Sequence, residues 1–323
     1  MSAVDDMPQT PRSSPDGAAV DPGAGAVPRP LQPVQVPGCG LTVAAVQPER
    51  EGLPPAVFVH GLGGSTQNWS LLMDRLAGDV DGQAVDLPGF GQSPPPDHGD
   101  LSVTAHMRAV VDYLELADRG PVHLFGNSLG GAVATRLAAL RPDLVRTLTL
   151  ISPALPELPP QRTALPTALL AMPGVPALFG RLTRNAPADQ QTEALLELCY
   201  GDPGQIDAER RAQMVAEYQR RMALPYSLDV LSGTARGIVR AYTERGEQSL
   251  WRQAQQVRVP VLLVYGLRDK LVSYRMARRA GQAFSDSRLL VLPEAGHVAM
   301  MEYPELVAAQ FRELLTAVPT RVG

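Results

Sequence analysis

A serine between glycines gives this chain a candidate nucleophile. Residues 126–131 read Gly-Asn-Ser-Leu-Gly-Gly, with Ser128 at the centre of a GxSxG pattern. A strand-like apolar run precedes the pattern and a helical pattern follows it. A strand, a sharp turn and a helix in this order would project the Ser128 hydroxyl above a sheet edge, where helix-terminal N–H groups face a developing anion. The pattern alone arises by chance in glycine-rich chains, so this context is what favours a nucleophile over a plain glycine turn.

A serine hydroxyl needs a general base to become a nucleophile. The chain contains five histidines, which are His60, His98, His106, His123 and His297. His123 lies in a predicted strand, His98 in a polar, proline-rich loop, and His106 on a surface-type helix. His297 begins the loop after the last predicted strand, and catalytic groups gather where such strands end. We therefore predict that His297 is the base and that His60 braces its own loop by hydrogen bonding.

An orienting carboxylate would complete the arrangement. Asp269 closely follows a strand-like apolar run, so the chain order is Ser128, Asp269, His297. A lone aspartate in a turn is usually a helix cap. Asp269, however, ends the strand before the one that leads to His297, which favours a catalytic role. Glu294 and Asp286 are weaker candidates, because both fall in loops away from that strand end.

A tetrahedral oxyanion needs two convergent N–H donors. One would be the backbone amide of Leu129, which directly follows the serine. The second should come from the loop after the early strand, residues 60–65, which read His-Gly-Leu-Gly-Gly-Ser. We expect this donor to be the amide of Leu62. Both donors are backbone groups, so the two side chains carry little information.

Short apolar runs alternate with helical patterns from about residue 40. The predicted strands are Ala56–Val59, Gln83–Leu87, Pro121–Gly126, Val145–Ile151, Val261–Tyr265 and Arg288–Leu292. The predicted helices are Gln67–Leu76, Val103–Leu116, Leu129–Leu140, Tyr274–Ala283 and Pro304–Ala317. This alternation predicts an α/β protein with a mostly parallel sheet and helices on both faces.

The alternation is interrupted once. Residues 154–254 are punctuated by prolines and then helical, with Asp207 as the cap of a helix within residues 206–224. We expect this segment to be a helical lid inserted into a core of residues 38–153 and 255–323. Residues 1–37 contain eight prolines and few large apolar side chains, so we expect a disordered N-terminal tail that is not a secretory signal.

Five segments in this order give the chain its resemblance to a known superfamily. They are VFVHGLGGS, DLPGFGQS at Asp86–Ser93, GNSLGG, YGLRD at Tyr265–Asp269 and AGHVAMMEYPE at Ala295–Glu305. Together they resemble the α/β-hydrolase fold superfamily, over nearly everything from residue 40 to residue 317. The resemblance implies an eight-stranded, mostly parallel sheet, a helical lid after strand six, and no cofactor.

The resemblance leaves several activities open. An aspartate nucleophile would resemble that of an epoxide hydrolase or a haloalkane dehalogenase. Ser128 occupies the nucleophile position here, which argues against both enzyme classes. Asn127 before the serine looks like the C–C bond hydrolases of aromatic ring-fission products, but Val298 stands where those enzymes usually carry tryptophan, and the oxyanion loop also departs from theirs. A serine carboxylesterase or lipase-like enzyme is therefore favoured, with C–C hydrolysis second. A perhydrolase, a lactonase, a lyase and a non-catalytic binding module remain alternatives, and the filled triad favours an enzyme.

The predicted lid suggests an apolar substrate. No charge lies between Thr163 and Gly180, and large apolar side chains recur there. The candidate substrate-binding residues are Leu165, Leu169, Met172, Phe179 and Val298. The same side chains would equally suit the face by which a lid packs on its core. Either way, we expect an apolar pocket under the lid for a small hydrophobic ester.

Composition excludes several function classes. With 33 acidic and 29 basic residues the net charge is −4, which offers no electrostatic footprint for nucleic acid. Lys270 is the sole lysine and does not form a phosphate-binding GK[ST] loop. Cys39 and Cys199 cannot form a cysteine metal cluster, and no paired-histidine metal motif occurs. Prolines and a glycine interrupt the apolar stretch before Gly180, so no stable membrane insertion is expected; we expect a cytoplasmic monomer or homodimer.

Overall fold

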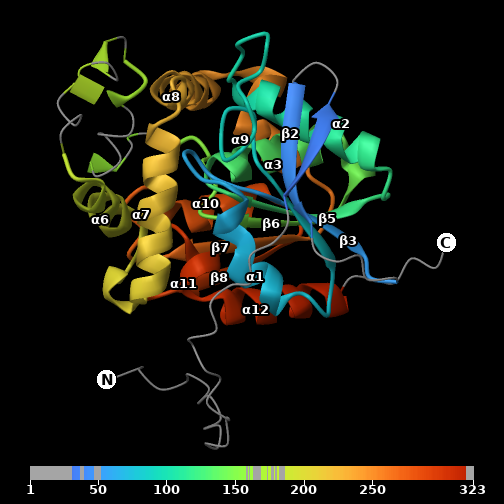
Figure 1. The fold of residues 1–323 in the computed structure, drawn as a ribbon. Coiled ribbons are helices and arrows are strands. Elements are labelled where there is room, and N and C mark those ends of the chain that lie inside the picture. The colour runs from blue at the N-terminus through green and yellow to red at the C-terminus, as the bar shows by residue number, and fades with distance from the viewer. Residues whose placement is uncertain are drawn as a thin grey trace, which may run out of the picture.

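The computed structural model describes residues 31–36, 40–46, 52–157, 159, 161–162, 169–172, 174–175, 178, 180–181 and 186–317 (Figure 1). The strands are β1 (Leu31–Val36), β2 (Gly40–Val46), β3 (Pro55–Val59), β4 (Asp81–Val85), β5 (Val122–Asn127), β6 (Val145–Ile151), β7 (Val261–Gly266) and β8 (Ser287–Leu292). The helices are α1 (Ser70–Arg75), α2 (Val103–Ala117), α3 (Leu129–Leu140), α6 (Ala188–Cys199), α7 (Ala208–Met222), α8 (Ser227–Thr243), α9 (Leu250–Gln256), α10 (Arg275–Ala283), α11 (Ala299–Glu302) and α12 (Pro304–Ala317). Short 3-10 helices are η1 (Thr66–Trp69), η2 (Pro142–Leu144), η4 (Pro203–Gln205) and η5 (Gly246–Gln248).

The strands form one sheet in the order β1-β2-β4-β3-β5-β6-β7-β8. From β4 to β8 every neighbouring pair is parallel, and only the two pairs that involve β2 are antiparallel. The predicted α/β class with a mostly parallel sheet is therefore confirmed. Parallel strands end at the same sheet edge, so the loops that follow β3, β5, β7 and β8 all open there.

The central strands are buried on both faces. In β3, Ala56 and Phe58 pack into one apolar layer and Val57 and Val59 into the other, as the two-residue period of a strand requires. Helices α1, α11 and α12 complete the first layer, and α2, α3, α9 and α10 complete the second (Figure 1). The loop-bearing sheet edge is thus held between two rigid layers.

The prediction of a disordered tail over residues 1–37 is wrong at its end. Leu31–Val36 form β1, which pairs with β2 along its full length, from Leu31 opposite Ala45 to Val36 opposite Gly40. Pro33 lies within β1, and a proline is tolerated there because β1 is an edge strand with no further neighbour. Residues 1–30 and residue 37 lie outside the described residues.

The described residues between β6 and α9 contain helices and no strand. We call residues 186–249, which include α6, α7 and α8, the insertion. Asp207 caps α7 as predicted, because its side chain accepts a hydrogen bond of 2.8 Å from the Arg210 amide. At the end of the predicted lid, Leu250 and Ala254 of α9 are buried in the core beside α3. No helix in the described part of the chain is long and apolar enough to cross a bilayer.

Phe125 of β5 lies at the centre of an aromatic cluster beneath the sheet edge. Its ring centroid lies 4.4 Å from that of Phe58 and 4.8 Å from that of Phe311. We predict that Phe125→Ala lowers the free energy of unfolding by about 3–5 kcal/mol, because it leaves a cavity with no compensating collapse. Leu306→Ala on the exposed face of α12 is the matched control and should change it by less than about 0.5 kcal/mol. Urea unfolding measures both, and equal effects would contradict the assignment of this cluster to the core.

Candidate active site

Ser128 lies in a strained turn between β5 and α3. Its backbone has φ 51° and ψ −115°, although it is not a glycine. Such a conformation costs on the order of 1–3 kcal/mol and persists only where the surroundings enforce it. Here the Ser128 amide donates to the Ile151 carbonyl at 3.1 Å, and the Ser128 carbonyl accepts from the amides of Ala132 and Ala154 at 3.1 and 2.9 Å. The turn predicted from the GxSxG pattern is present.

The glycines of the pattern are required by close backbone approach. A Cβ on Gly130 would lie 2.1 Å from the Val59 carbonyl oxygen, and one on Gly126 would lie 2.4 Å from the Gly130 carbonyl oxygen. A Cβ on Gly131 would meet Pro153 at 2.7 Å. The first turn of α3 therefore presses directly against the end of β3, which bears the predicted oxyanion loop.

The structure brings Asp269 and His297 together. His297 Nδ1 and Asp269 Oδ2 lie 2.9 Å apart, and both side chains are almost fully buried. The second carboxylate oxygen accepts the amides of Leu271 and Val272 at 2.8 and 2.9 Å. Burial alone would raise the pKa of Asp269, but the His297 charge and hydrogen bond and the Val272 amide outweigh it and lower that pKa. An ionised Asp269 carboxylate thus fixes the orientation of the His297 ring.

The two weaker acid candidates do not take this place. Glu294 forms an ion pair with Arg268, and both side chains are exposed. Asp286 is exposed in the loop before β8, where its backbone carbonyl accepts the Val261 amide. Asp269 is therefore the carboxylate that meets the histidine.

Asn127 ties the serine turn to the histidine loop. Its Nδ2 donates to the Ile151 carbonyl and to the His297 carbonyl, each at 3.0 Å, and the side chain is buried. The residue before Ser128 thus holds the backbone of His297 across the sheet edge. The asparagine is visible in the sequence, but its reach to residue 297 depends on strand order, which the sequence does not specify.

Glu302 is a second positioning residue that the sequence reasoning missed. Its carboxylate accepts the Gly296 amide at 2.8 Å and the Gly201 amide at 2.7 Å. In addition, the His297 amide donates to the Cys199 carbonyl at 2.7 Å. The end of α6 in the insertion is therefore bonded directly to the histidine loop.

The predicted oxyanion loop lies beside the serine. Its turn is closed by a 3.0 Å bond from the Gly64 amide to the Gly61 carbonyl, and Gly63 has φ +71°, which favours glycine. A Cβ on Gly61 would lie 3.1 Å from Ser128 Cβ. Within the described residues, neither the Leu62 nor the Leu129 amide donates to another protein group. Both amides therefore remain free to bind a ligand oxygen.

His60 braces this loop. Its Nδ1 donates to the Gly61 carbonyl at 2.7 Å, and its Nε2 accepts the Leu87 amide at 3.0 Å. Full burial lowers its pKa to about 4, although the Gly61 hydrogen bond opposes the shift. The ring is thus neutral and structural, which agrees with the prediction that it does not titrate in catalysis.

The remaining histidines lie elsewhere. His123 is buried in β5 and bonds to Thr147 Oγ1 at 2.8 Å. His98 is exposed and accepts the Asp100 amide. The prediction of a surface position for His106 is wrong: it is buried where α2 packs against α8 of the insertion. The face of α2 that carries His106 is covered by α8, a contact that the sequence pattern of α2 alone does not reveal.

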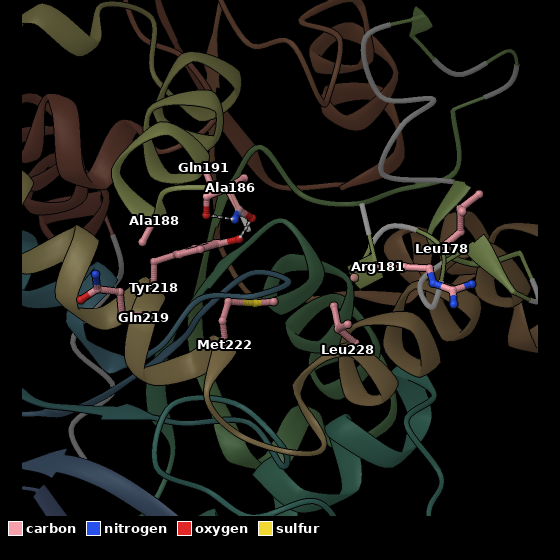
Figure 2. Close-up of a pocket in the computed structure, with 10 residues that line it drawn as sticks. Leu178, Arg181, Ala186, Ala188, Gln191, Tyr218, Gln219, Met222 and Leu228 are labelled. Carbon is pink, nitrogen blue, oxygen red and sulfur yellow. Dashed lines mark hydrogen bonds between the residues drawn. The ribbon is translucent and has the colours of Figure 1, made fainter. Parts of the chain in front are cut away.

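A cavity of about 920 Å³ lies between α6, α7 and α8 of the insertion and the preceding residues Leu178, Gly180 and Arg181 (Figure 2). Tyr218, Met222, Leu228 and Ala188 are among its lining residues, and the Tyr218 hydroxyl is bonded to Gln191 at one side. None of the serine, aspartate and histidine of the site lines it. The cavity agrees with the expected apolar pocket, but its lining differs from the predicted one.

The predicted substrate-binding residues have separate outcomes. Leu165 and Phe179 lie outside the described residues. Leu169 and Met172 are exposed and do not line the cavity. Val298 is buried next to His297 in the apolar layer of α11 and α12. Leu178 and Gly180 of the predicted apolar stretch do line the cavity, together with residues of α6, α7 and α8. The described residues hold no cluster of three or more metal-ligating side chains.

Residues 54–304 match the family model of the alpha/beta hydrolase fold. The chain is 30% identical over 267 residues to the dihydrolipoyllysine-residue acetyltransferase component of an acetoin cleaving system from Pseudomonas putida. That match covers 82% of this chain but only 64% of the relative, so the chain spans less than two thirds of that protein. It is 28% identical over 287 residues to a pimeloyl-(acyl-carrier protein) methyl ester esterase from Neisseria meningitidis, covering 84% of this chain and 99% of the relative. A meta-cleavage product hydrolase variant from Pseudomonas fluorescens IP01 shares the fold, with TM-score 0.72, 18% identity and coverage of 88% and 97%.

We predict that Gly130→Ala strongly destabilises the protein, by about 3 kcal/mol or more, because its Cβ would meet the backbone of β3. Gly281→Ala in α10 is the matched control. A Cβ on Gly281 meets nothing within 4 Å, so alanine should stabilise that helix by up to about 1 kcal/mol. Urea unfolding of both variants checks the pair, and a mild effect of Gly130→Ala would show that the approach is not tight.

We predict that the protein loses stability as the pH falls from 7 to 5. Burial lowers the pKa of His60 and His123 to about 4 and that of His106 to about 3, whereas the unfolded chain takes up these protons near its ordinary value of about 6.5. Acid therefore favours the unfolded state. Asp86 acts in the opposite sense, since burial raises its pKa to about 6. Because the effect of the three histidines exceeds that of Asp86, the free energy of unfolding should fall by on the order of 3 kcal/mol between pH 7 and pH 5. Equal stability at both pH values in urea titrations would refute this.

Proposed function

The chain belongs to the α/β hydrolase fold family, and on that premise we propose that it is a serine hydrolase that cleaves carboxylic esters. It is a hydrolase by family, and the ester specificity is the finer proposal. The observation that carries the proposal is the side chain of Asn127, which joins the turn of Ser128 to the backbone of His297 at 3.0 Å. This bond holds nucleophile and base on one sheet edge.

In the first step, His297 Nε2 accepts the Ser128 hydroxyl proton as Oγ attacks the ester carbonyl. Asp269 already binds Nδ1, so it fixes the tautomer that leaves Nε2 free and stabilises the imidazolium that forms. The free amides of Leu62 and Leu129 would bind the oxyanion, and each such donor is worth roughly 10²–10³ in rate. The imidazolium then returns its proton to the leaving alcohol, which gives the acyl-enzyme.

In the second step, water replaces the alcohol. His297 accepts a water proton, the hydroxide attacks the acyl carbonyl, and the collapse of the intermediate returns the proton to Ser128 Oγ and releases the acid. The similarity to a methyl ester esterase from Neisseria meningitidis supports an ester substrate. The cavity in the insertion supports a hydrophobic component of that substrate.

We predict that Ser128→Ala lowers the kcat for p-nitrophenyl butyrate by at least about 1,000-fold, because the acyl-enzyme cannot form. A fluorophosphonate probe should label the wild-type chain and not the variant. A wild-type rate in Ser128→Ala, or unchanged labelling, would place the nucleophile elsewhere. Wild-type protein that cleaves a ring-fission dienone but no ester would favour the C–C hydrolase alternative. Absent labelling and turnover would favour a binding module.

We predict that Asp269→Asn lowers turnover of the same ester by roughly 1,000- to 10,000-fold without unfolding the chain, because the amide no longer supports the correct imidazole tautomer. Asp286→Asn is the matched control, because that side chain is exposed and has no part in the proposed mechanism, and it should retain the wild-type rate. If the two variants showed the same rate, the orienting carboxylate would not be Asp269.

A further inference from the structure

Arg221 of α7 brings a positive charge from the insertion to the oxyanion loop. Its Nη1 donates to the Gly63 carbonyl. Its guanidinium lies over the Tyr218 ring, 5.3 Å from the ring centroid. The side chain is half-buried, and burial lowers its pKa. Within the described residues it forms no ion pair with a carboxylate, and the other four of its five N–H donors have no protein acceptor.

The neighbouring arginine shows what a structural contact looks like here. Arg220 Nη2 donates to the Gly91 carbonyl at 2.9 Å, so it too joins α7 to a core loop. Its charge is neutralised, because Glu217 forms a two-point ion pair with it at 2.6 and 2.7 Å. Arg221 makes the same kind of loop contact, but among the described residues it has no direct ion pair, and Glu217 acts on it only through its charge. A partly buried guanidinium with unused N–H donors is well suited to bind an anionic group.

The place of Arg221 relative to the reaction follows from the loop it contacts. Gly63 directly follows Leu62, whose amide is a proposed oxyanion donor, and Gly61 lies against Ser128 Cβ. The guanidinium therefore lies beside the proposed oxyanion loop rather than on a remote surface. Tyr218, whose ring lies under the Arg221 guanidinium, also lines the cavity (Figure 2).

We propose that Arg221 binds an ionised carboxylate in the acyl part of the substrate, so that the natural ester is a monoester of a dicarboxylic acid. This inference rests on the proposed function and names its substrate class. Free N–H donors of a guanidinium match the two oxygens of a carboxylate. The carboxylate would form a direct ion pair with Arg221, and it would stay bound through both steps because the acyl part remains on the enzyme.

The test compares mono-p-nitrophenyl adipate with p-nitrophenyl heptanoate, two esters of similar acyl length that differ in the terminal charge. The wild-type chain should have the higher kcat/KM for the adipate ester. Arg221→Gln should lose about 10- to 100-fold on the adipate ester and change less than about threefold on the heptanoate ester, which also reports correct folding. Arg220→Gln, the matched control, should leave the ratio of the two substrates unchanged. Free adipate should inhibit the wild-type chain competitively and Arg221→Gln far more weakly.

Each contrary outcome has its own meaning. A wild-type preference for the heptanoate ester, or an equal loss on both esters in Arg221→Gln, would overturn the carboxylate site and leave Arg221 as a strut between α7 and the loop. Such results would leave the ester hydrolase intact, because heptanoate turnover and fluorophosphonate labelling would persist. If wild-type protein hydrolysed neither ester and was not labelled, the proposed function would fail first and this inference with it.

Discussion

The site depends on the close contact between the first turn of α3 and the end of β3. Because Gly130 leaves no atom between the helix backbone and the Val59 carbonyl, the helix begins directly beside the oxyanion loop. Ser128, directly before this helix, has a positive φ. The apolar layers on both sides of the sheet, rather than the turn itself, stabilise the fold enough to offset this strain. The rigid core therefore holds the serine in its strained conformation.

The polar groups around the site show a division of labour. Asn127, His60 and Glu302 bind backbone groups, so their effect is to fix where loops run. Asp269 binds both backbone amides and a side chain, and it therefore links loop position to the chemistry of His297. Arg221 differs from all of these because most of its donors are unused. The loops around the proposed triad are therefore fixed by several hydrogen bonds each, whereas Arg221 keeps donors that could bind a ligand.

The sequence predicted the parts of the fold that depend on local pattern. The bounds of α3 and α12 and the presence of strands β3 to β8 follow from periodicity, and the serine turn follows from the spacing of its glycines. The pairing of Asp269 with His297 could also be predicted from the sequence, since both residues follow adjacent strands. β1 was missed because Pro33 argues against a strand unless the edge position is known. Two hydrogen bonds join residues far apart in the chain, one from Asn127 to His297 and one from Gly201 to Glu302, and no local sequence pattern encodes such contacts. Leu169 and Met172 were wrongly expected to line the cavity, because apolar composition does not distinguish a pocket lining from an exposed face.

The bonds between the end of α6 and the histidine loop also constrain how this enzyme can be altered. Cys199 and Gly201 contribute backbone groups to the surroundings of His297, and a Cβ on Gly201 would lie 2.0 Å from the Glu294 carbonyl oxygen. The insertion is consequently not a detachable module. A chimera that exchanged residues 186–249 for the equivalent segment of a relative would import new walls for the cavity and, with them, a new backbone setting for the base. Substrate range and catalytic geometry are therefore inherited together in this chain, and they can be separated only by leaving residues 199–201 in place.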